Sequence, residues 1–597
     1  MIVLGLSAFY HDSAAAIVVD GVIVAAAQQE RFSRKKNDAT FPADAARFCL
    51  EKAGVTLDQV DYVAFYDKPL LTFDRLLETY MAYAPSGFTS FFKAIPVWVK
   101  EKILQKTLIM EGLDELDLGT VKPDQVVFGF HHHSHAASAY YPSPFDDAAI
   151  LVMDGVGEWA TTSAGIGEGA SVTLTKEIRF PHSIGMLYSA FTYYLGFKVN
   201  DGEYKVMGLA PYGEPKYVDT ILDNLITIND DGSYHLDMQY FNYCTGLTMT
   251  NRKFDTLFAG PPRKPQQPLT QKHMDIARSV QAVTEQIVLK LVENLYLESG
   301  KKNLCLAGGV ALNCVANGRI LRESSFENIW IQPAAGDAGS ALGVALAVAN
   351  EMGDGTRIPA LPKSGDSMRG SYLGPEFDNQ AIRETLNHHD AKFEHIADET
   401  KLFDIAATAL AAEQVVGWFQ GAMEFGPRAL GNRSILGDAA SSSMQKVLNL
   451  KIKYREGFRP FAPAVLKEDT KEYFDLDGDS PYMLLVAPVL ESRRLENKDN
   501  NLQGLAKLNE IRSDIPAVTH VDYSARVQTV DGVTNPRFKA LLETFKAKTG
   551  RGVLINTSFN VRDEPVVCTP EDAYRCFMAT EMDMLVMGDF VLRKDQQ

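Results

Sequence analysis

Four histidines lie within five positions in the stretch FGFHHHSHAASAYY, residues 128–141, and the whole chain holds only twelve. If a helix begins at residue 131, the side chains of His131 and His135 are four positions apart and lie on one helix face. Two imidazoles placed in this way can bind one metal ion, whereas His132 and His133 point elsewhere. A surface cluster of histidines or a contact to phosphate is the alternative for such a stretch.

Two aspartates at loop openings extend this set. Asp154 closes the apolar strand AAILVMD, and Asp337 lies in the glycine-rich loop AAGDAGSALG. Two imidazoles with carboxylates suit Fe(II), Zn(II) or Mn(II), and a set of two histidines and one carboxylate leaves positions open for substrate. No cysteine stands close by in the sequence, which argues against a closed structural zinc site. The sequence therefore predicts a metal site at His131, His135, Asp154 and Asp337.

Two glycine-rich stretches each lie between a predicted strand and a predicted helix: GGVALN, residues 308–313, and GDAGSALG, residues 336–343. Backbone N–H groups at a helix start face outwards, where phosphates bind. Tight turns use glycine in any case, but two such stretches in one domain favour a nucleotide site. Lys36 in ERFSRKKN and Lys205 in YKVMGLAPYG are candidate phosphate contacts; a solvated charge run and a helix-surface lysine are the alternatives.

Four arginines of the C-terminal part stand in glycine-, proline- or turn-rich sequence rather than on amphipathic helices. They are Arg428, Arg433, Arg459 and Arg526. The guanidinium fork binds a phosphate through two parallel N–H groups, where lysine supplies a point charge. In NTSFN, Ser558 and Asn560 alternate along a predicted strand, so both side chains can face one ligand. A structural salt bridge explains any single arginine, but the set predicts a site for a small anionic substrate.

The elements that must position these residues begin with a hairpin. The chain opens with the apolar runs VLGLS and AAIVVD, and Asp20-Gly21 then separates AAIVVD from VIVAAAQQE, which is a strong hairpin signal. A looser version recurs over residues 148–169, followed by VTLTKEIRF. Two such units, each with an acidic residue at a strand end or loop, predict a duplicated α/β domain of the actin/sugar-kinase type.

A domain boundary is predicted at residues 352–374, where the sequence MGDGTRIPALPKSGDSMRGSYLG is rich in glycine, proline and serine. Before it, apolar residues over 274–297 recur at helical spacing. After it, VVGWFQG, YMLLVAPVL and GVLINTSF predict a separate set of strands. We therefore expect one domain over residues 1–360 and a second over residues 375–597.

Composition narrows the classes of function. A chain of 597 residues is too long for one hydrophobic core. Its 59 basic and 76 acidic residues give a net charge of −17, which argues against broad binding to nucleic acid or anionic membrane. It has no run of about 20 apolar residues, and its N-terminus predicts a strand rather than a signal peptide. Six cysteines without framework spacing indicate reduced thiols in the cytoplasm; monomer and homodimer both stay open.

Taken together, these motifs resemble the O-carbamoyltransferase family of antibiotic and nodulation-factor biosynthesis, over nearly the whole chain. The resemblance rests on LGLSAFYHDSAAAIVVDG, QERFSRKKN, HHHSHAASAYY, LVMDGVGEW, YKVMGLAPYG, LAGGVALNCVANGRI, MEFGPRALGNRSIL, FRPFAP and NTSFNVRDEP. It implies an α/β fold in which a duplicated actin/sugar-kinase-like, metal-binding domain is followed by an α+β YrdC-like domain. In such enzymes the YrdC-like domain makes carbamoyl adenylate from carbamoyl phosphate and ATP, with Mg²⁺, and the first domain passes the carbamoyl group to a hydroxyl.

The resemblance also implies roles for single residues. The metal, with Fe²⁺ suggested and Zn²⁺ permitted, would lie on the four residues predicted above. Nucleotide or adenylate contacts would come from Lys36, Lys205, Gly309 and Asn313. Carbamoyl phosphate would meet Arg428, Arg459, Arg526, Ser558 and Asn560. His11 is the candidate general base, because its reference pKa of about 6.5 suits removal of the acceptor's proton; a structural loop histidine is the alternative.

The acceptor and two other functions stay open at this point. Acceptor contacts are expected in residues 70–125 and 215–270, which show no recognisable signature, so only a small-molecule alcohol is implied. Carbamoyl transfer to a protein cysteine or to tRNA is one alternative, and the negative net charge speaks against tRNA. A nucleotide-switched, actin-like binding protein is the other, but it leaves the arginine-rich second domain without a task.

Overall fold

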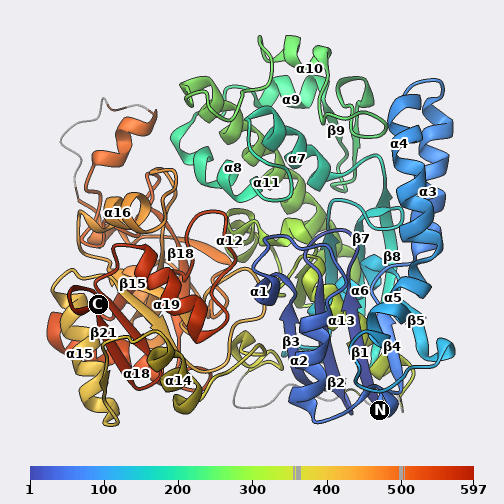
Figure 1. The fold of residues 1–597 in the computed structure, drawn as a ribbon. Coiled ribbons are helices and arrows are strands. Elements are labelled where there is room, and N and C mark those ends of the chain that lie inside the picture. Colours follow the sequence, from blue (N-terminus) through green and yellow to red (C-terminus); the bar gives the residue numbers. More distant parts are fainter. Residues whose placement is uncertain (354–356, 358–364, 496–501, 503) are drawn as a thin grey trace. The chain divides into compact units, whose positions relative to one another are not determined.

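The computed structural model describes the chain except residues 354–356, 358–364, 496–501 and 503. The described chain divides into two compact units (Figure 1). The first comprises Met1–Gln29 and Asn37–Ala360, and the second comprises Glu30–Lys36 and Leu361–Gln597. Among the described residues no helix has the length and apolar character needed to cross a bilayer.

The first unit contains two five-stranded sheets of the same topology. One has the order β3-β2-β1-β4-β5 and the other the order β8-β7-β6-β11-β12. In each, the first three strands are antiparallel neighbours and the last two run parallel to the third. The strands of the first sheet are β1 (Ile2–Ser7), β2 (Ala14–Val19), β3 (Val22–Gln28), β4 (Tyr62–Phe65) and β5 (Val126–Phe128). Those of the second are β6 (Asp147–Met153), β7 (Ala160–Glu168), β8 (Ser171–Arg179), β11 (Asn303–Ala307) and β12 (Asn328–Ile331). The predicted duplication is confirmed.

The first hairpin forms where the Asp-Gly pair predicts it. Asp20 and Gly21 connect β2 to β3 with φ values of +48° and +76°. Two consecutive positive φ angles give a turn whose twist matches that of the strands it joins. Aspartate and glycine tolerate this backbone region better than other residues, which fixes the register of β2 against β3.

Two helices carry metal-site candidates and are in close contact. Helix α6 (His131–Tyr140) and helix α13 (Asp337–Glu351) are both almost wholly buried. A Cβ atom at Gly343 would overlap the carbonyl oxygen of Ser134, and one at Gly5 would overlap that of Ala341. Glycine at these two positions therefore lets α13 lie directly against α6 and β1. This contact places the start of α13 beside the first turn of α6.

One other helix of the first unit was predicted from its apolar spacing, and a helical region lies between β4 and β5. Helix α11 (Gln271–Ser299) includes the predicted helical stretch, and Gly300 ends it in the left-handed conformation. The region 70–125 is mainly helical and contains α3 (Pro69–Tyr83), α4 (Phe88–Trp98) and α5 (Gln105–Asp114). Figure 1 shows α3 and α4 as a pair of neighbouring helices.

The second unit is built on a mixed nine-stranded sheet with the order β13-β21-β20-β14-β15-β19-β16-β18-β17. Its strands are β13 (Glu394–His395), β14 (Val416–Phe419), β15 (Arg433–Asp438), β16 (Ala462–Leu466), β17 (Leu485–Pro488), β18 (Ser524–Val530), β19 (Val553–Ser558), β20 (Met584–Met587) and β21 (Phe590–Arg593). Helices α15 (Glu399–Ala411) and α18 (Pro536–Thr549) bury apolar side chains against it, around Trp418.

A short N-terminal segment also belongs to the second unit. Helix α1 (Glu30–Ser33) leads into Arg34, and Arg31 within the helix and Arg34 after it both bind loop carbonyls of that unit. Arg31 donates to Gly426 O at 2.9 Å, and Arg34 donates to Val566 O and Pro565 O at 2.6 and 2.8 Å. Nothing in the sequence pattern of residues 30–36 indicates this placement, because it depends on contacts with residues about 400 to 530 positions further along.

Candidate functional site

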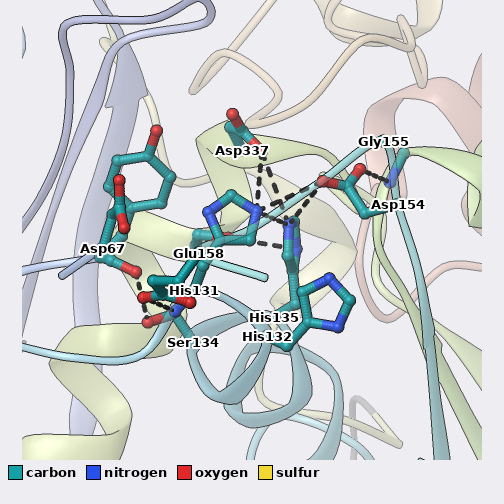
Figure 2. A network of polar contacts seen from close by, with 12 residues as sticks. Asp67, His131, His132, Ser134, His135, Asp154, Gly155, Glu158 and Asp337 are labelled. Carbon is teal, nitrogen blue, oxygen red and sulfur yellow. Dashed lines mark hydrogen bonds and ion pairs between the residues drawn. The ribbon is translucent and has the colours of Figure 1, made fainter. Parts of the chain in front are cut away.

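The four predicted metal ligands come together in the first unit. His131 and His135 lie one turn apart at the start of α6, Asp154 follows the last residue of β6, and Asp337 is the first residue of α13. One ligand atom from each of the four lies within 4.8 Å of every other. Figure 2 shows the two imidazoles and the two carboxylates turned toward one another.

The distances within this cluster suit a single ion. His131 Nε2 and His135 Nε2 are 3.1 Å apart. Asp154 Oδ2 lies 3.3 and 3.9 Å from these two nitrogens, and Asp337 Oδ1 lies 3.6 and 3.5 Å from them. Four ligands about 2.1 Å from a tetrahedral ion are about 3.4 Å from one another. The donor set of two imidazoles and two carboxylates therefore suits zinc or ferrous iron, with small shifts of the side chains that lie further apart.

Neighbouring groups orient the ligands. Ser340 Oγ lies 3.1 Å from His135 Nδ1, so Nδ1–H donates to it when Nε2 faces the cluster. The N–H of Gly309 donates to Asp154 Oδ1 at 2.8 Å, and the N–H of His131 donates to the buried carboxyl of Glu158 at 2.9 Å. The first two contacts orient the side chains of His135 and Asp154, as is typical of a metal-binding arrangement, and the third holds the backbone at the start of α6.

The charges in the cluster depend on one another. Burial opposes the charge of His131, but the hydrogen bond to Asp154 and the charge of Asp337 outweigh it and raise the His131 pKa to about 10. Burial raises the pKa of the Asp154 carboxyl, but the neighbouring imidazoles His131 and His135 hold it well below its usual range. Two buried carboxylates require positive charge between them, which a protonated imidazole or a divalent cation can supply.

The other two histidines of the stretch have different surroundings. His132 Nδ1 lies 2.7 Å from Ser163 Oγ, and burial together with the charge of His131 lowers the His132 pKa. His133 Nε2 lies 3.0 Å from the carboxylate of Glu351 at the end of α13. Helical spacing thus separates two side chains that face the cluster from two that point elsewhere, as the sequence predicts.

His11 lies at the edge of the cluster, in the loop after β1. Its Nδ1 is 3.0 Å from Asp12 Oδ2, and its Nε2 is 3.8 Å from Asp337 Oδ2. Burial opposes its charge, but Asp337 and Asp12 outweigh it and raise the His11 pKa to about 9. The imidazole is therefore protonated at neutral pH, whereas a general base must be neutral. Positive charge beside Asp337 would lower this pKa.

The residues predicted to contact a nucleotide make local contacts. Asn313 accepts a hydrogen bond from Ala316 N as the N-cap of α12 (Cys314–Glu323), and it exchanges two hydrogen bonds with Gln281. Lys205 in α8 (Glu203–Leu209) lies with its ammonium 5.9 Å from the ring centre of Phe197. The Gly309 N–H is directed to Asp154, as described above. Lys36 belongs to the second unit, whereas Lys205, Gly309 and Asn313 belong to the first.

The predicted anion-binding residues of the second unit lie at one edge of its sheet. Arg428 precedes β15, Arg459 precedes β16, and Arg526 is the third residue of β18. Strand β16 is parallel to β18, while β19 is antiparallel to β15 and β16. The starts of β15, β16 and β18 therefore meet the end of β19, where Ser558 and Asn560 lie. Ser558 Oγ donates to Asn560 Oδ1 at 2.8 Å.

A buried lysine at the same edge is a residue that sequence reasoning missed. Lys453 is 2% exposed, and its ammonium contacts both the carbonyl and the hydroxyl oxygen of Ser558. It also lies 3.0 Å from Asn560 O and 2.6 Å from Asn560 Oδ1. Burial, with the charges of Arg455 and Arg459, lowers its pKa well below that of an ordinary lysine. In the sequence, Lys453 is the second lysine of KIKYREGFRP. Its closeness there to Arg455 and Arg459 is the feature from which it could have been predicted.

One of the four arginines is structural. Arg433, the first residue of β15, is fully buried and donates to the carbonyl oxygens of Gln420, Gly421 and Pro375. Its guanidinium lies 3.7 Å from the ring centre of Phe419. These contacts engage both terminal nitrogens of the guanidinium within the fold, while Nε has no hydrogen-bond partner. The turn-rich sequence context of Arg433 therefore reflects packing against neighbouring loops.

Comparison with protein families decides the class. The model described as "Carbamoyltransferase N-terminus" matches residues 2–346, and that described as "Carbamoyltransferase C-terminus" matches residues 407–594. The chain belongs to the O-carbamoyltransferase family. It is thus an enzyme, a carbamoyltransferase. Apart from Glu30–Lys36, the two matches fall in the first and second structural units respectively.

Three relatives illustrate the range of this carbamoyltransferase family. An uncharacterized protein of Synechocystis sp. is 60% identical over 600 residues, covering 100% of this chain and 97% of its own. The nodulation protein NolNO of Sinorhizobium fredii is 37% identical, covering 98% of this chain and 80% of its own. The 3'-hydroxymethylcephem-O-carbamoyltransferase of Streptomyces clavuligerus is 35% identical, covering 49% of each chain. Among solved structures, T. kodakarensis HypF matches with a TM-score of 0.29 and 13% identity, over 59% of this chain and 47% of its own.

Proposed function

We propose that this carbamoyltransferase uses ATP to convert carbamoyl phosphate to carbamoyl adenylate, and then transfers the carbamoyl group to a hydroxyl of a small molecule. The observation that carries the proposal is that one chain contains a polar centre that suits a cation and another that suits an anion. The cluster of the first unit gathers carboxylates and imidazoles and suits a cation, whereas the sheet edge of the second gathers basic and amide side chains and suits an anion.

The second unit, as a YrdC-like domain, would form the adenylate. Water splits carbamoyl phosphate into carbamate and phosphate, and the carbamate oxygen then attacks the α-phosphorus of ATP, held with Mg²⁺, so that pyrophosphate leaves. This step is needed because carbamate itself would have to expel oxide, whereas carbamoyl adenylate expels AMP. Lys453 and the arginines Arg428, Arg459 and Arg526 neutralise the phosphate, and Ser558 and Asn560 orient the carbamoyl amide.

The first unit would carry out the transfer. The acceptor oxygen attacks the carbamoyl carbon, the bond to the adenylate oxygen breaks, and AMP leaves. His11, beside Asp337, is our candidate to take the hydroxyl proton once positive charge next to Asp337 has lowered the His11 pKa. Lys36, Lys205, Gly309 and Asn313 are our candidates to hold the nucleotide. His131, His135, Asp154 and Asp337 would hold a ferrous or zinc ion, which supplies Lewis-acid stabilisation of negative charge.

The relatives support a hydroxyl acceptor. One relative is named 3'-hydroxymethylcephem-O-carbamoyltransferase, a name that gives a hydroxymethyl group as the acceptor. Two others are named nodulation proteins. A small-molecule alcohol is the acceptor class we propose here.

The test is to incubate the full chain with ATP and carbamoyl phosphate but no acceptor. We expect pyrophosphate in solution and carbamoyl adenylate by mass spectrometry, both dependent on carbamoyl phosphate. Pyrophosphate release at the same rate without carbamoyl phosphate would contradict the proposal. Once the adenylate is seen, alcohols can be screened for carbamoylation, and AMP release should match the product formed.

A further inference from the structure

Helix α4 and the turn that follows it expose an apolar stripe. Nine of the 21 exposed large apolar side chains in the described part of the chain fall between residues 70 and 104. Phe88 and Phe92 are 72% and 70% exposed, and their rings stack with centres 6.5 Å apart. Pro96, Val99 and Ile103 continue the exposed row at intervals of three or four residues. We call these five residues the α4 stripe.

The opposite side of α4 is occupied by the protein. Tyr80 of α3 contacts Phe91 and Trp98 of α4, with ring centres 5.3 and 5.5 Å away. The start of the helix is fixed because Ser90 donates to the carbonyl oxygen of Thr245. One face of α4 already packs against the protein. The α4 stripe is therefore the outward face of a helix that is held in place, and it does not form part of the hydrophobic core.

The sequence segment that carries the stripe has a net charge opposite to that of the chain. Residues 84–110 contain four lysines and a single glutamate, a net charge of +3, whereas the whole chain has −17. Lys93 and Lys106 are exposed. A helix with aromatic and aliphatic residues on one face and lysines beside it is typical of segments that lie in the plane of a membrane interface.

We propose that the α4 stripe docks on an anionic lipid surface, with the Phe88 and Phe92 rings in the headgroup region and the exposed Lys93 and Lys106 against lipid phosphates. A second copy of this chain is the other possible occupant, but protein interfaces are depleted in lysine at their centre. The net charge of −17 argues only against membrane binding through the surface of the chain as a whole. At physiological salt the electrostatic field of charged side chains acts only over a short distance, so a local basic surface can still bind anionic lipid. The surface contact involves no membrane-spanning helix and does not depend on the reaction proposed above.

The test is flotation of the full chain with vesicles of phosphatidylcholine containing about a third phosphatidylglycerol, against vesicles of phosphatidylcholine alone. We expect the protein to float with the anionic vesicles and to be released by high salt. The double variant F88S/F92S should reduce the bound fraction about tenfold or more, because it removes most of the buried apolar contact. The variant K93E/K106E should reduce it by a similar factor on anionic vesicles only.

The matched control is L297S/V533S, which removes two side chains that are 71% and 57% exposed elsewhere in the chain. It should float like the unmodified protein. Equal flotation of F88S/F92S and the control would overturn the proposal, as would equal binding to both kinds of vesicle at any salt concentration. A dimer by light scattering that F88S/F92S converts to a monomer, without flotation of the unmodified protein, would assign the stripe to a second copy instead.

Discussion

The polar centre of the first unit and that of the second are assembled from opposite chemistry. In the first, each carboxylate lies within 4 Å of both imidazoles, and the charges support one another: the pKa of His131 is raised and that of Asp154 is lowered. In the second, a buried ammonium lies among neutral oxygens beside arginines, and the pKa of Lys453 is lowered. The first centre therefore suits a bound cation, and the second suits a bound anion.

The difference shows that burial alone does not decide what a polar cluster does. His135 and Lys453 are both almost fully buried, yet the first faces carboxylates and the second faces amide and hydroxyl oxygens. A buried group whose partners already carry the opposite charge is stabilised within the protein. A buried cation with only neutral partners gains further stabilisation when an anion binds beside it. Substitutions in each centre should therefore impair different half-reactions.

The largest expected effect separates the two centres. His135→Ala removes a ligand from the four-residue cluster, so we expect loss of bound metal, by elemental analysis, and a drop in carbamoyl transfer of more than about a hundredfold. Carbamoyl adenylate formation should persist, because the second unit is unchanged. His133→Ala is the control, since His133 lies on the same helix but contacts Glu351. Retention of both metal and transfer in H135A would contradict the metal assignment.

The converse substitution lies in the second unit. Lys453→Met leaves four oxygen atoms without their cation and removes the charge beside the predicted phosphate, so adenylate formation should fall about a hundredfold while metal content stays constant. Lys451→Met is the control, because Lys451 is exposed and pairs with Glu581. Binding of carbamoyl phosphate should weaken as the pH rises through the lowered pKa of Lys453, since only the protonated form carries the charge. This pH dependence should be absent from K453M.

A smaller effect tests how the metal ligands are held. Ser340→Ala removes the oxygen that His135 Nδ1 contacts at 3.1 Å, so metal affinity should fall about tenfold with little change in stability. Ser138→Ala is a closely matched control, because Ser138 is equally buried and donates to the backbone carbonyl of His135 rather than to its ring. Metal competition with a chelator measures both. Equal affinities of S340A and S138A would show that Ser340 does not orient the ring.

The sequence predicts the first centre better than the second for a physical reason. Helical spacing relates His131 to His135, and strand or loop ends locate Asp154 and Asp337, so local pattern alone suggested that these four meet. The second centre depends on which strands are neighbours in the sheet. The order β15-β19-β16-β18 brings residues from four separated segments to one edge, and no local period encodes it. Lys453 was missed for this reason. The sequence pattern alone could not separate Arg433 from the other three arginines, because its partners are carbonyl groups of other segments.

The duplicated sheets and the Asp-Gly hairpin were predictable because each depends on residues close in sequence. The contact of α13 with α6 was not, since it depends on the absence of a side chain at Gly343 opposite Ser134. The placement of Glu30–Lys36 in the second unit could not be predicted from the sequence either. In each case the deciding interaction joins residues far apart in the chain.

The smallest expected effect uses a third pair of histidines, His182 and His235, whose ring centres are 3.6 Å apart. Burial and the charge of His235 lower the His182 pKa to about 4, the reverse of His131, whose partners are carboxylates. The unfolded chain, with a pKa near 6.5, then binds more protons than the folded one between about pH 6.5 and pH 4. Stability should fall as the pH falls through this window.

Because His182 is partly exposed, solvent screening reduces the expected loss to about 1 kcal/mol. Melting temperatures at pH 7.5 and pH 5 should therefore differ less in His182→Gln than in the unmodified protein. Glutamine can still accept the hydrogen bond that Leu236 N donates to His182 Nδ1 at 3.2 Å, so the variant should fold normally. His235→Gln removes the like charge and should shrink the pH effect without abolishing it, since burial acts in the same direction. An unchanged pH dependence of stability in both variants would show that the facing imidazoles of His182 and His235 do not cause it. The contrast with His131 and His135, whose partners are carboxylates, would then have no electrostatic basis.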